Sequence, residues 1–272
     1  MSQVSKNLEL SEDGPLLDGL SFLTVKSRSL RGRADITLFV PEQARGLRNV
    51  PLVILLHGVH GSHWAWSIKG GAHRTAQRLI NQGRIPPLVL AMPSDGLRGD
   101  GSGYLPFPNQ NIEKWIVEDV PRAVARGAAC LSGKSPLFLC GLSMGGFGAL
   151  RIGAKYPALY RGISGHSSVT HFEQMLKFVE KGLALHTPAQ DCSVLEAMLR
   201  HRATLPPIRF DCGTEDSLLK HNRQLHRDLE AHGIAHHYEE FPGGHDWNYW
   251  SAHLEDSLRF FREILTAPKR SH

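Results

Sequence analysis

The sequence contains no long hydrophobic run, and this absence sets the first limit on what the chain does. Its apolar segments have the length of strands and stay well short of the ~20 residues that a membrane-spanning helix needs. The first twenty residues carry acidic side chains where a secretory signal needs a basic start and an apolar middle. We therefore expect a soluble, cytoplasmic protein with no membrane partner.

Cysteines are few, and none of them stands in a pattern that carries chemistry. The four cysteines include no C-x-x-C pair, and Cys140 and Cys212 fall within apolar stretches, where a thiol usually behaves as a small hydrophobic group. The H-E-x-x-H motif of zinc hydrolases is absent as well. The sequence therefore offers no sign of an oxidising compartment, and we expect neither a metal nor a cofactor.

Basic residues exceed acidic ones only slightly, by 31 to 26, which leaves a formal net charge of +5. The densest basic stretch contains Lys26, Arg28, Arg31 and Arg33, inside a segment that reads as a hairpin. Bases that alternate along a strand are typical of a solvated face. We therefore expect no nucleic-acid partner.

The composition and the apolar pattern predict an α/β protein of one domain, residues 1–272. At 272 residues, 41% hydrophobic and 21% charged, the chain has ordinary globular values. Short apolar runs alternate with helical patterns, which predicts a mostly parallel sheet with helices on both faces. Residues 169–205 contain helical pieces but no strand, and we expect them to form an insertion or cap over the active site.

The pattern also places the individual elements along the chain. Residues 24–41 predict an antiparallel hairpin that turns at Arg31-Gly32. The expected strands that follow are 51–56, 87–92, 136–140, 160–164, 207–212 and 236–241. The expected helices are 71–83, 111–131, 146–156, 218–232 and 248–265.

The strongest chemical signal is the G-x-S-x-G pattern around Ser143, which lies between an apolar strand and a helical stretch. A serine at such a sharp turn has strained backbone geometry, and glycines two positions away on each side avoid collisions with neighbouring main chain. The turn lifts the hydroxyl above the sheet, next to the free N–H groups of a helix N-terminus. We therefore predict that Ser143 is a nucleophile.

A serine nucleophile needs a base and an orienting carboxylate, which this kind of fold supplies in the order acid, then histidine. Asp216 follows the strand PIRFDC, and His245 follows the next strand and two glycines, so we predict these two partners. Glu215 is the rival acid. Asp246 adjoins the base and is expected to cap the final helix instead.

Acyl transfer also needs two N–H donors for the oxyanion. Met144, directly after the serine, and Val59, in the loop HGVHGS, are the predicted backbone donors. The histidines of that loop, His57, His60 and His63, resemble a metal site only in their spacing, since no acid or cysteine lies at ligand spacing.

Several nearby side chains are candidates for the substrate pocket. His57 is expected to support the loop, while His60 is expected to face the pocket. Trp64 and Trp66 would either line an acyl or alcohol site or pack the loop onto the core, and the sequence leaves both readings open. Two further candidates, Tyr104 and His166, stand where the carboxyl edge of the sheet should open.

Six segments of the chain occur in the order of a known family. They are the hairpin KSRSLRGRADITLFVP, the loop LLHGVHGS, the segment MPSDGLRGDGSGY, the elbow GLSMGG, and then DCGTED and GGHDW. In these segments the chain resembles the Putative esterase family, which includes esterase D, tributyrin esterases, feruloyl esterases and mycolyltransferases. The resemblance implies an α/β-hydrolase fold with a triad of Ser143, Asp216 and His245, and it places Val59 in the oxyanion loop.

The residues and the resemblance together predict a serine carboxylesterase that hydrolyses short-chain esters of small molecules through an acyl-enzyme. S-formylglutathione hydrolases usually carry a cysteine in a loop that here reads HGVHGSHW, and feruloyl esterases and mycolyltransferases are typically secreted. The alternatives are an acyltransferase that uses the same acyl-enzyme, an S-formylglutathione-type thioesterase, and a non-catalytic binding protein with a hydrolase fold.

Overall fold

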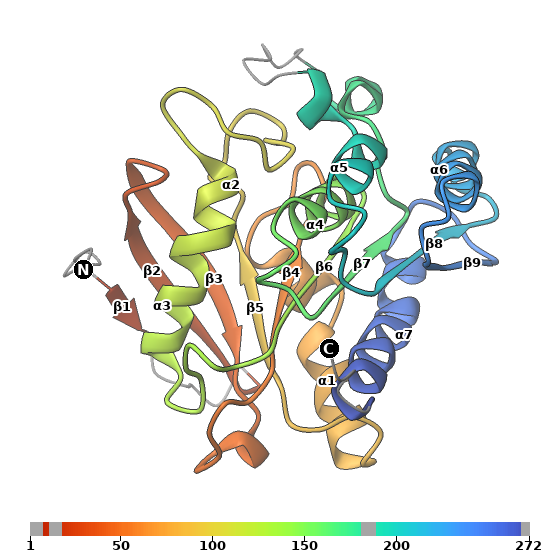
Figure 1. Cartoon of the computed structure of the whole chain (residues 1–272). Helices are drawn as coiled ribbons and strands as arrows, with labels where there is room; N and C mark the ends of the chain where they lie inside the picture. The colour runs from red at the N-terminus through yellow and green to blue at the C-terminus, as the bar shows by residue number, and fades with distance from the viewer. Residues whose placement is uncertain (1–7, 11–17, 181–188, 268–272) are drawn as a thin grey trace.

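The computed structural model describes residues 8–10, 18–180 and 189–267, and within them the chain forms one nine-stranded sheet (Figure 1). The strand order is β1-β2-β3-β5-β4-β6-β7-β8-β9. The first three strands and the β3–β5 pair are antiparallel, and all pairs from β5 to β9 are parallel. The predicted mostly parallel sheet with an N-terminal antiparallel hairpin is confirmed.

The six strands predicted after the hairpin are all present, with ends that differ by a few residues. The strands are β1 (Leu8–Leu10), β2 (Leu20–Ser27), β3 (Gly32–Phe39), β4 (Leu52–Leu56), β5 (Val89–Pro93), β6 (Leu137–Leu142), β7 (Gly162–His166), β8 (Ile208–Gly213) and β9 (His237–Phe241). The hairpin begins earlier than expected, and its turn lies just before Gly32, with Arg31 at a φ of 54°. The short edge strand β1 was not expected.

The helices lie close to their predicted positions. They are α1 (Ala72–Asn81), α2 (Ile112–Lys114), α3 (Val120–Gly127), α4 (Met144–Lys155), α5 (Val194–Arg200), α6 (Leu219–Ala231) and α7 (Trp247–Thr266). The single helix expected over 111–131 is divided, because a π-helical turn at Trp115–Asp119 separates α2 from α3. In the part of the chain that is described, no helix is long and apolar enough to cross a membrane.

The sheet has a hydrophobic core on each face, and the central strand β4 shows why. Its residues alternate, so Leu52, Ile54 and Leu56 join one core, while Val53 and Leu55 join the other. Buried residues of α3, α4, α5 and α6 belong to the first core. Those of α1 and α7 belong to the second, so helices cover both faces of the sheet.

Residues 169–205 lie against α4, on the first of these faces, as far as they are described. They contain no strand; Phe172 and Met175 are buried, and α5 packs on α4 (Figure 1). Residues 181–188 of this predicted insertion lie outside the described part of the chain.

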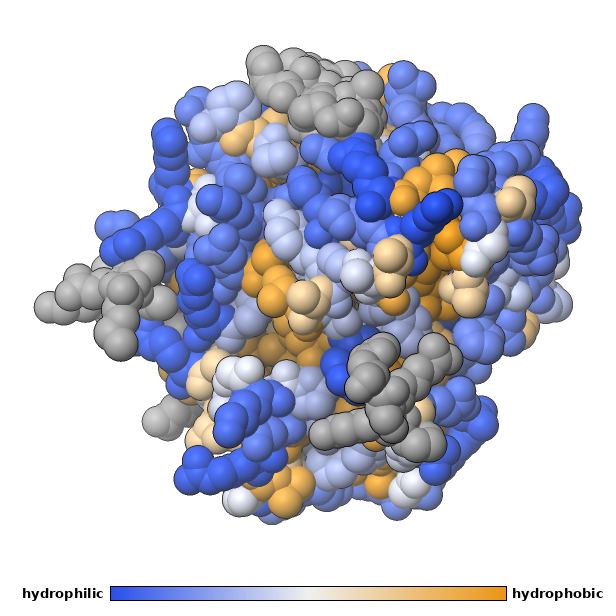
Figure 2. All heavy atoms as spheres, in the orientation of Figure 1, coloured by the Kyte–Doolittle hydropathy of each residue, from blue (hydrophilic) through white to orange (hydrophobic). Residues whose placement is uncertain are grey.

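The surface agrees with the charge pattern of the sequence. Lys26, Arg28, Arg31 and Arg33 are all exposed on the hairpin, as expected for a solvated face. Figure 2 shows a mostly hydrophilic surface on which apolar residues occur in separate groups.

The parallel strands bring their carboxyl ends to one edge of the sheet, and this edge positions the candidate site. The chain leaves β4, β6, β8 and β9 there, although these strands are far apart in sequence. The loops after them carry the predicted site residues, as is usual for open α/β sheets.

Candidate active site

Ser143 occupies the sharp turn that the sequence predicts between β6 and α4. Its backbone has φ 53° and ψ −117°, a conformation that is rare for a residue with a side chain. A Cβ atom at Gly141 would collide with the backbone of Gly145, and a Cβ at Gly145 would collide with the carbonyl of Leu56. Both glycines are therefore required for the chain to turn here.

The structure brings Ser143, His245 and Asp216 into one hydrogen-bonded chain. The Ser143 Oγ lies 2.9 Å from Nε2 of His245, and Nδ1 of the same ring lies 2.8 Å from Oδ2 of Asp216. A neutral imidazole with its proton on Nδ1 satisfies both contacts, because the serine hydroxyl then donates to Nε2. This arrangement can take a proton from the hydroxyl.

Asp216 is buried and held as a carboxylate. Burial acts to raise its pKa, but the hydrogen bond and charge of His245 and the hydrogen bond from the Leu218 N–H outweigh burial and lower the pKa. The rival Glu215 is exposed. Asp246 caps α7, as expected, by accepting from two backbone N–H groups of its first turn.

The loop of Asp216 is tied directly to the loop of His245. The Thr214 N–H donates to the Phe241 carbonyl at 2.8 Å, and the Glu215 N–H donates to the Gly243 carbonyl at 3.0 Å. A Cβ at Gly213 would collide with that same Gly243 carbonyl. Two loops from adjacent strands thus form one rigid support for the imidazole and its carboxylate.

Val59 and Met144, the predicted oxyanion donors, lie beside the serine. Val59 follows Gly58, where a Cβ would stand 3.4 Å from the Cβ of Ser143, and Met144 is the first residue of α4. A Cβ at Gly101 would contact both the Met144 sulfur and the Val59 side chain. The N–H groups of a first helical turn have no partner within their helix, so the Met144 N–H is not used by α4 itself.

The three histidines of the loop after β4 have three separate partners. His57 is buried, with Nδ1 2.7 Å from the Gly58 carbonyl, so it supports the loop as expected. His60 is exposed, and its Nε2 donates to the Phe178 carbonyl at 3.0 Å. His63 contacts the Thr37 hydroxyl at 2.8 Å.

The two tryptophans of the same loop differ. Trp66 is buried and donates from Nε1 to the Leu56 carbonyl at 2.9 Å, so it packs the loop onto the core. Trp64 is half-buried, with the Lys69 ammonium 5.7 Å from its ring centroid. A role for Trp64 in substrate binding stays a prediction.

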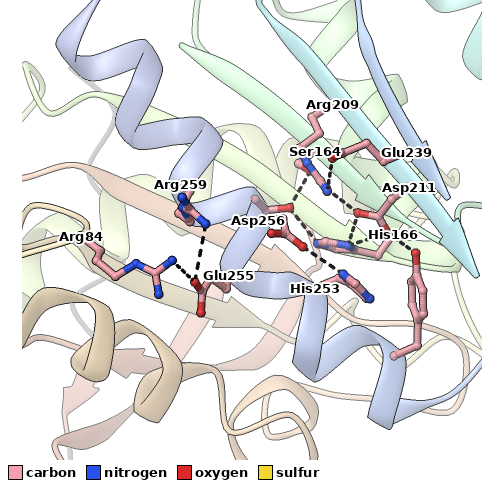
Figure 3. A network of polar contacts seen from close by, with 12 residues as sticks. Arg84, Ser164, His166, Arg209, Asp211, Glu239, His253, Glu255, Asp256 and Arg259 are labelled. Carbon is pink, nitrogen blue, oxygen red and sulfur yellow. Dashed lines mark hydrogen bonds and ion pairs between the residues drawn. The ribbon is translucent and has the colours of Figure 1, made fainter. Parts of the chain in front are cut away.

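The prediction that Tyr104 and His166 line the substrate pocket is wrong, because both side chains are completely buried. Tyr104 is 0% exposed and donates from its hydroxyl to the His57 carbonyl at 3.0 Å, beneath the loop rather than above it. His166 is also 0% exposed, and its ring points from β7 toward Asp211 on β8 (Figure 3). Both residues are structural supports of the edge, not parts of its surface.

His166 belongs to a buried ionic network next to the serine. Its Nδ1 lies 2.9 Å from Asp211 Oδ2 (Figure 3). Its Nε2 contacts the Ser257 hydroxyl of α7 at 2.8 Å. Arg209 and Tyr249 also donate to Asp211. The backbone carbonyl of His166 accepts the Ser143 N–H at 2.9 Å, so the network supports the turn that carries the serine.

This network predicts that stability depends on pH. Burial acts to lower the pKa of His166, but the Asp211 carboxylate outweighs burial and raises the pKa to about 10. Since the pKa of His166 is higher in the folded chain, its stabilisation is complete below the ordinary value of 6.5 and is lost as the pH rises toward 10.

We expect the free energy of unfolding, measured by urea denaturation, to fall between pH 7 and pH 10. The variant His166→Gln should show a smaller fall over the same range. A free energy that stays level or rises in the wild-type protein would contradict a charged His166.

Several residues of the site were missed by the sequence reasoning, among them Asp95, Asp100, Phe178 and Trp250. Asp95 accepts the N–H groups of Leu97 and Ser102, which shapes the loop beside Met144. Asp100 and Phe178 lie at the edge of the site and are described below. Only Asp95 had a local signal, since an aspartate that accepts from a residue two positions ahead is a common turn.

The chain is similar in sequence to known proteins. Residues 27–261 match the family described as Putative esterase. An acetyl esterase from Caldicellulosiruptor saccharolyticus is 24% identical over 240 residues, which cover 79% of this chain and 85% of that protein.

Two solved structures share the fold. A ferulic acid esterase superposes with a TM-score of 0.77 at 22% identity, covering 90% of this chain and 98% of that chain. An S-formylglutathione hydrolase from Agrobacterium tumefaciens superposes with a TM-score of 0.78 at 19% identity, covering 94% and 99%. The chain therefore has the α/β-hydrolase fold, belongs to the Putative esterase family, and is a carboxylic ester hydrolase.

Proposed function

We propose that the protein is a serine carboxylesterase that hydrolyses short-chain acyl esters through a covalent acyl-enzyme. The observation that carries this proposal is the unbroken hydrogen-bonded chain from the Ser143 hydroxyl through His245 to the Asp216 carboxylate. Such a chain activates a hydroxyl that is otherwise a poor nucleophile.

In the proposed mechanism, Ser143 Oγ attacks the ester carbonyl while Nε2 of His245 takes its proton. The imidazolium then donates this proton to the alcohol that leaves, and an acyl group remains on the serine. Water, deprotonated by the same imidazole, then attacks the acyl carbon. The bond between this carbon and Ser143 Oγ breaks, the acid leaves, and the imidazolium returns its proton to the serine. Asp216 keeps the proton on Nδ1 and stabilises the positive charge on the ring.

When Ser143 attacks, negative charge develops on the carbonyl oxygen of the ester. This oxygen needs N–H donors on the side of the serine that lies away from His245. We assign this role to the backbone N–H groups of Val59 and Met144. Two observations support this assignment: Gly58 lies close to Ser143, and a Cβ at Gly101 would meet both the Met144 sulfur and the Val59 side chain. Each donor of this kind contributes roughly 10²–10³ in turnover in other acyl-transfer enzymes.

The substrate in this proposal is a small-molecule ester with a short acyl group. Ser143 is only 2% exposed, which favours small groups around the reacting carbonyl. The curated relative from Caldicellulosiruptor saccharolyticus carries the name acetyl esterase, which points to the same class.

We also propose that the chain is a single domain in which the described parts of residues 169–205 form a cap beside the active site. The shared cores support one domain, because buried residues of this segment pack with those of the sheet. The contacts between Phe178 and the site, described below, support the cap.

A fluorophosphonate probe tests the proposed function directly, because it reacts with activated serines. We expect the probe to label about one site per chain and to abolish hydrolysis of p-nitrophenyl acetate in proportion to the labelling. A chelator should leave the hydrolysis unchanged. Hydrolysis that persists after complete labelling would contradict a serine mechanism.

A further inference from the structure

Phe178 lies against the proposed catalytic histidine. Its ring is stacked on the His245 ring, with the centroids 5.3 Å apart and the planes at 14°. Trp250 contacts the same imidazole edge-on, at 5.0 Å and 88°. The imidazole thus contacts two aromatic rings, one of which comes from a segment 67 residues earlier in the chain.

The backbone of this segment is bound to the opposite side of the site. The Phe178 carbonyl accepts from His60 Nε2 at 3.0 Å, and His60 follows the proposed oxyanion donor Val59. The Glu180 N–H donates to the Asp100 carboxylate at 2.8 Å, and the Asp100 carbonyl accepts the His60 N–H at 2.8 Å. Asp100 therefore joins residues 178–180 to the oxyanion loop.

Through these contacts Phe178 connects the two sides of the site between which Ser143 lies. Ser143 lies between Gly58 on the oxyanion side and His245 on the other side. Phe178 touches the first side through its carbonyl and the second through its ring. Phe178 therefore lies close to a substrate that is bound at Ser143, because it contacts both His60 and His245.

We propose that Phe178 determines specificity by limiting the size of the alcohol part of the ester. This inference rests on the proposed function, in which His245 gives its proton to the leaving alcohol. The alcohol oxygen must come within hydrogen-bond reach of Nε2, so the alcohol lies next to the imidazole and to the ring stacked on it. The inference therefore concerns the alcohol and not the acyl group, which stays bonded to Ser143 after the alcohol has left.

The test compares ethyl acetate with benzyl acetate, which differ only in their alcohols. In Phe178→Ala, kcat/KM for benzyl acetate relative to ethyl acetate should rise about 10-fold or more over the wild-type ratio, because a steric limit has been removed. The ratio of ethyl hexanoate to ethyl acetate, which reports on the acyl side, should change far less.

Leu176 supplies the matched control, because it belongs to the same segment and is 55% exposed. Leu176→Ala should keep both wild-type ratios. If Phe178→Ala no longer unfolds cooperatively, the same comparison can be made with Phe178→Leu, which keeps an apolar side chain smaller than phenylalanine.

An unchanged alcohol ratio in a folded Phe178 variant overturns the inference, as does a change confined to the acyl ratio. General loosening of the site would lower kcat/KM for all three esters together and would leave the ratios constant. Failure of the proposed function is visible separately, since the wild-type protein would then neither hydrolyse the esters nor react with the fluorophosphonate probe.

Discussion

Replacing Ser143 with alanine should lower the turnover of p-nitrophenyl acetate by roughly 10⁴–10⁶-fold, by analogy with deletions in other triads. The hydroxyl is the atom that forms the bond to the acyl group in the proposed mechanism. Without it, only water held near His245 and the oxyanion donors could react. The measurement is kcat from initial rates at saturating ester.

The variant should remain folded, which makes the result interpretable. The contacts that hold the turn are made by backbone atoms, since the Ser143 N–H donates to His166 and its carbonyl accepts from Val169. Alanine keeps both. Ser217→Ala, at an exposed position near the site, is the control and should keep nearly full activity. Substantial turnover in Ser143→Ala would remove this serine from the mechanism.

Replacing Asp211 with alanine should have the largest effect on stability, lowering the free energy of unfolding by about 3–5 kcal/mol. Asp211 is completely buried and lies between two buried cations, His166 and Arg209. Removing the carboxylate takes the counter-charge away from the buried His166 and leaves Arg209 to pair with Glu239 at the surface. Urea denaturation at pH 7 measures the change.

Glu239 offers a matched control, because it pairs with the same arginine from an exposed position. Its carboxylate lies 2.8 Å from the Arg209 guanidinium, but its side chain is 49% exposed. Glu239→Ala should therefore change the free energy of unfolding by no more than about 1 kcal/mol. Similar losses in both variants would mean that burial does not govern the strength of these ion pairs.

The sequence predicted the parts of the site that depend on short-range rules. A nucleophile at a strand-to-helix turn needs small neighbours. Gly141 and Gly145 meet this requirement and can be recognised directly in the sequence. Asp216 and His245 could be selected because each follows a strand whose carboxyl end must lie at the same edge. Topology then places them together without any knowledge of side-chain packing.

The same short-range rules do not predict the direction in which a side chain points. Tyr104 and His166 lie at the correct edge of the sheet, but both side chains point into the interior, where buried partners satisfy their polar atoms. Phe178 was missed for a different reason. It reaches the site through contacts with residues far away in sequence, and no local pattern marks such a contact.

The sheet order has a consequence for how the molecules behave toward one another. An open sheet can grow when a second chain adds a strand to its edge, and long, flat, apolar edges favour such growth. Within the residues that the structure describes, one edge is β1, with three residues, and the other is β9, where His237 and Glu239 face the solvent. Brevity at one end and polar side chains at the other disfavour aggregation through strand addition.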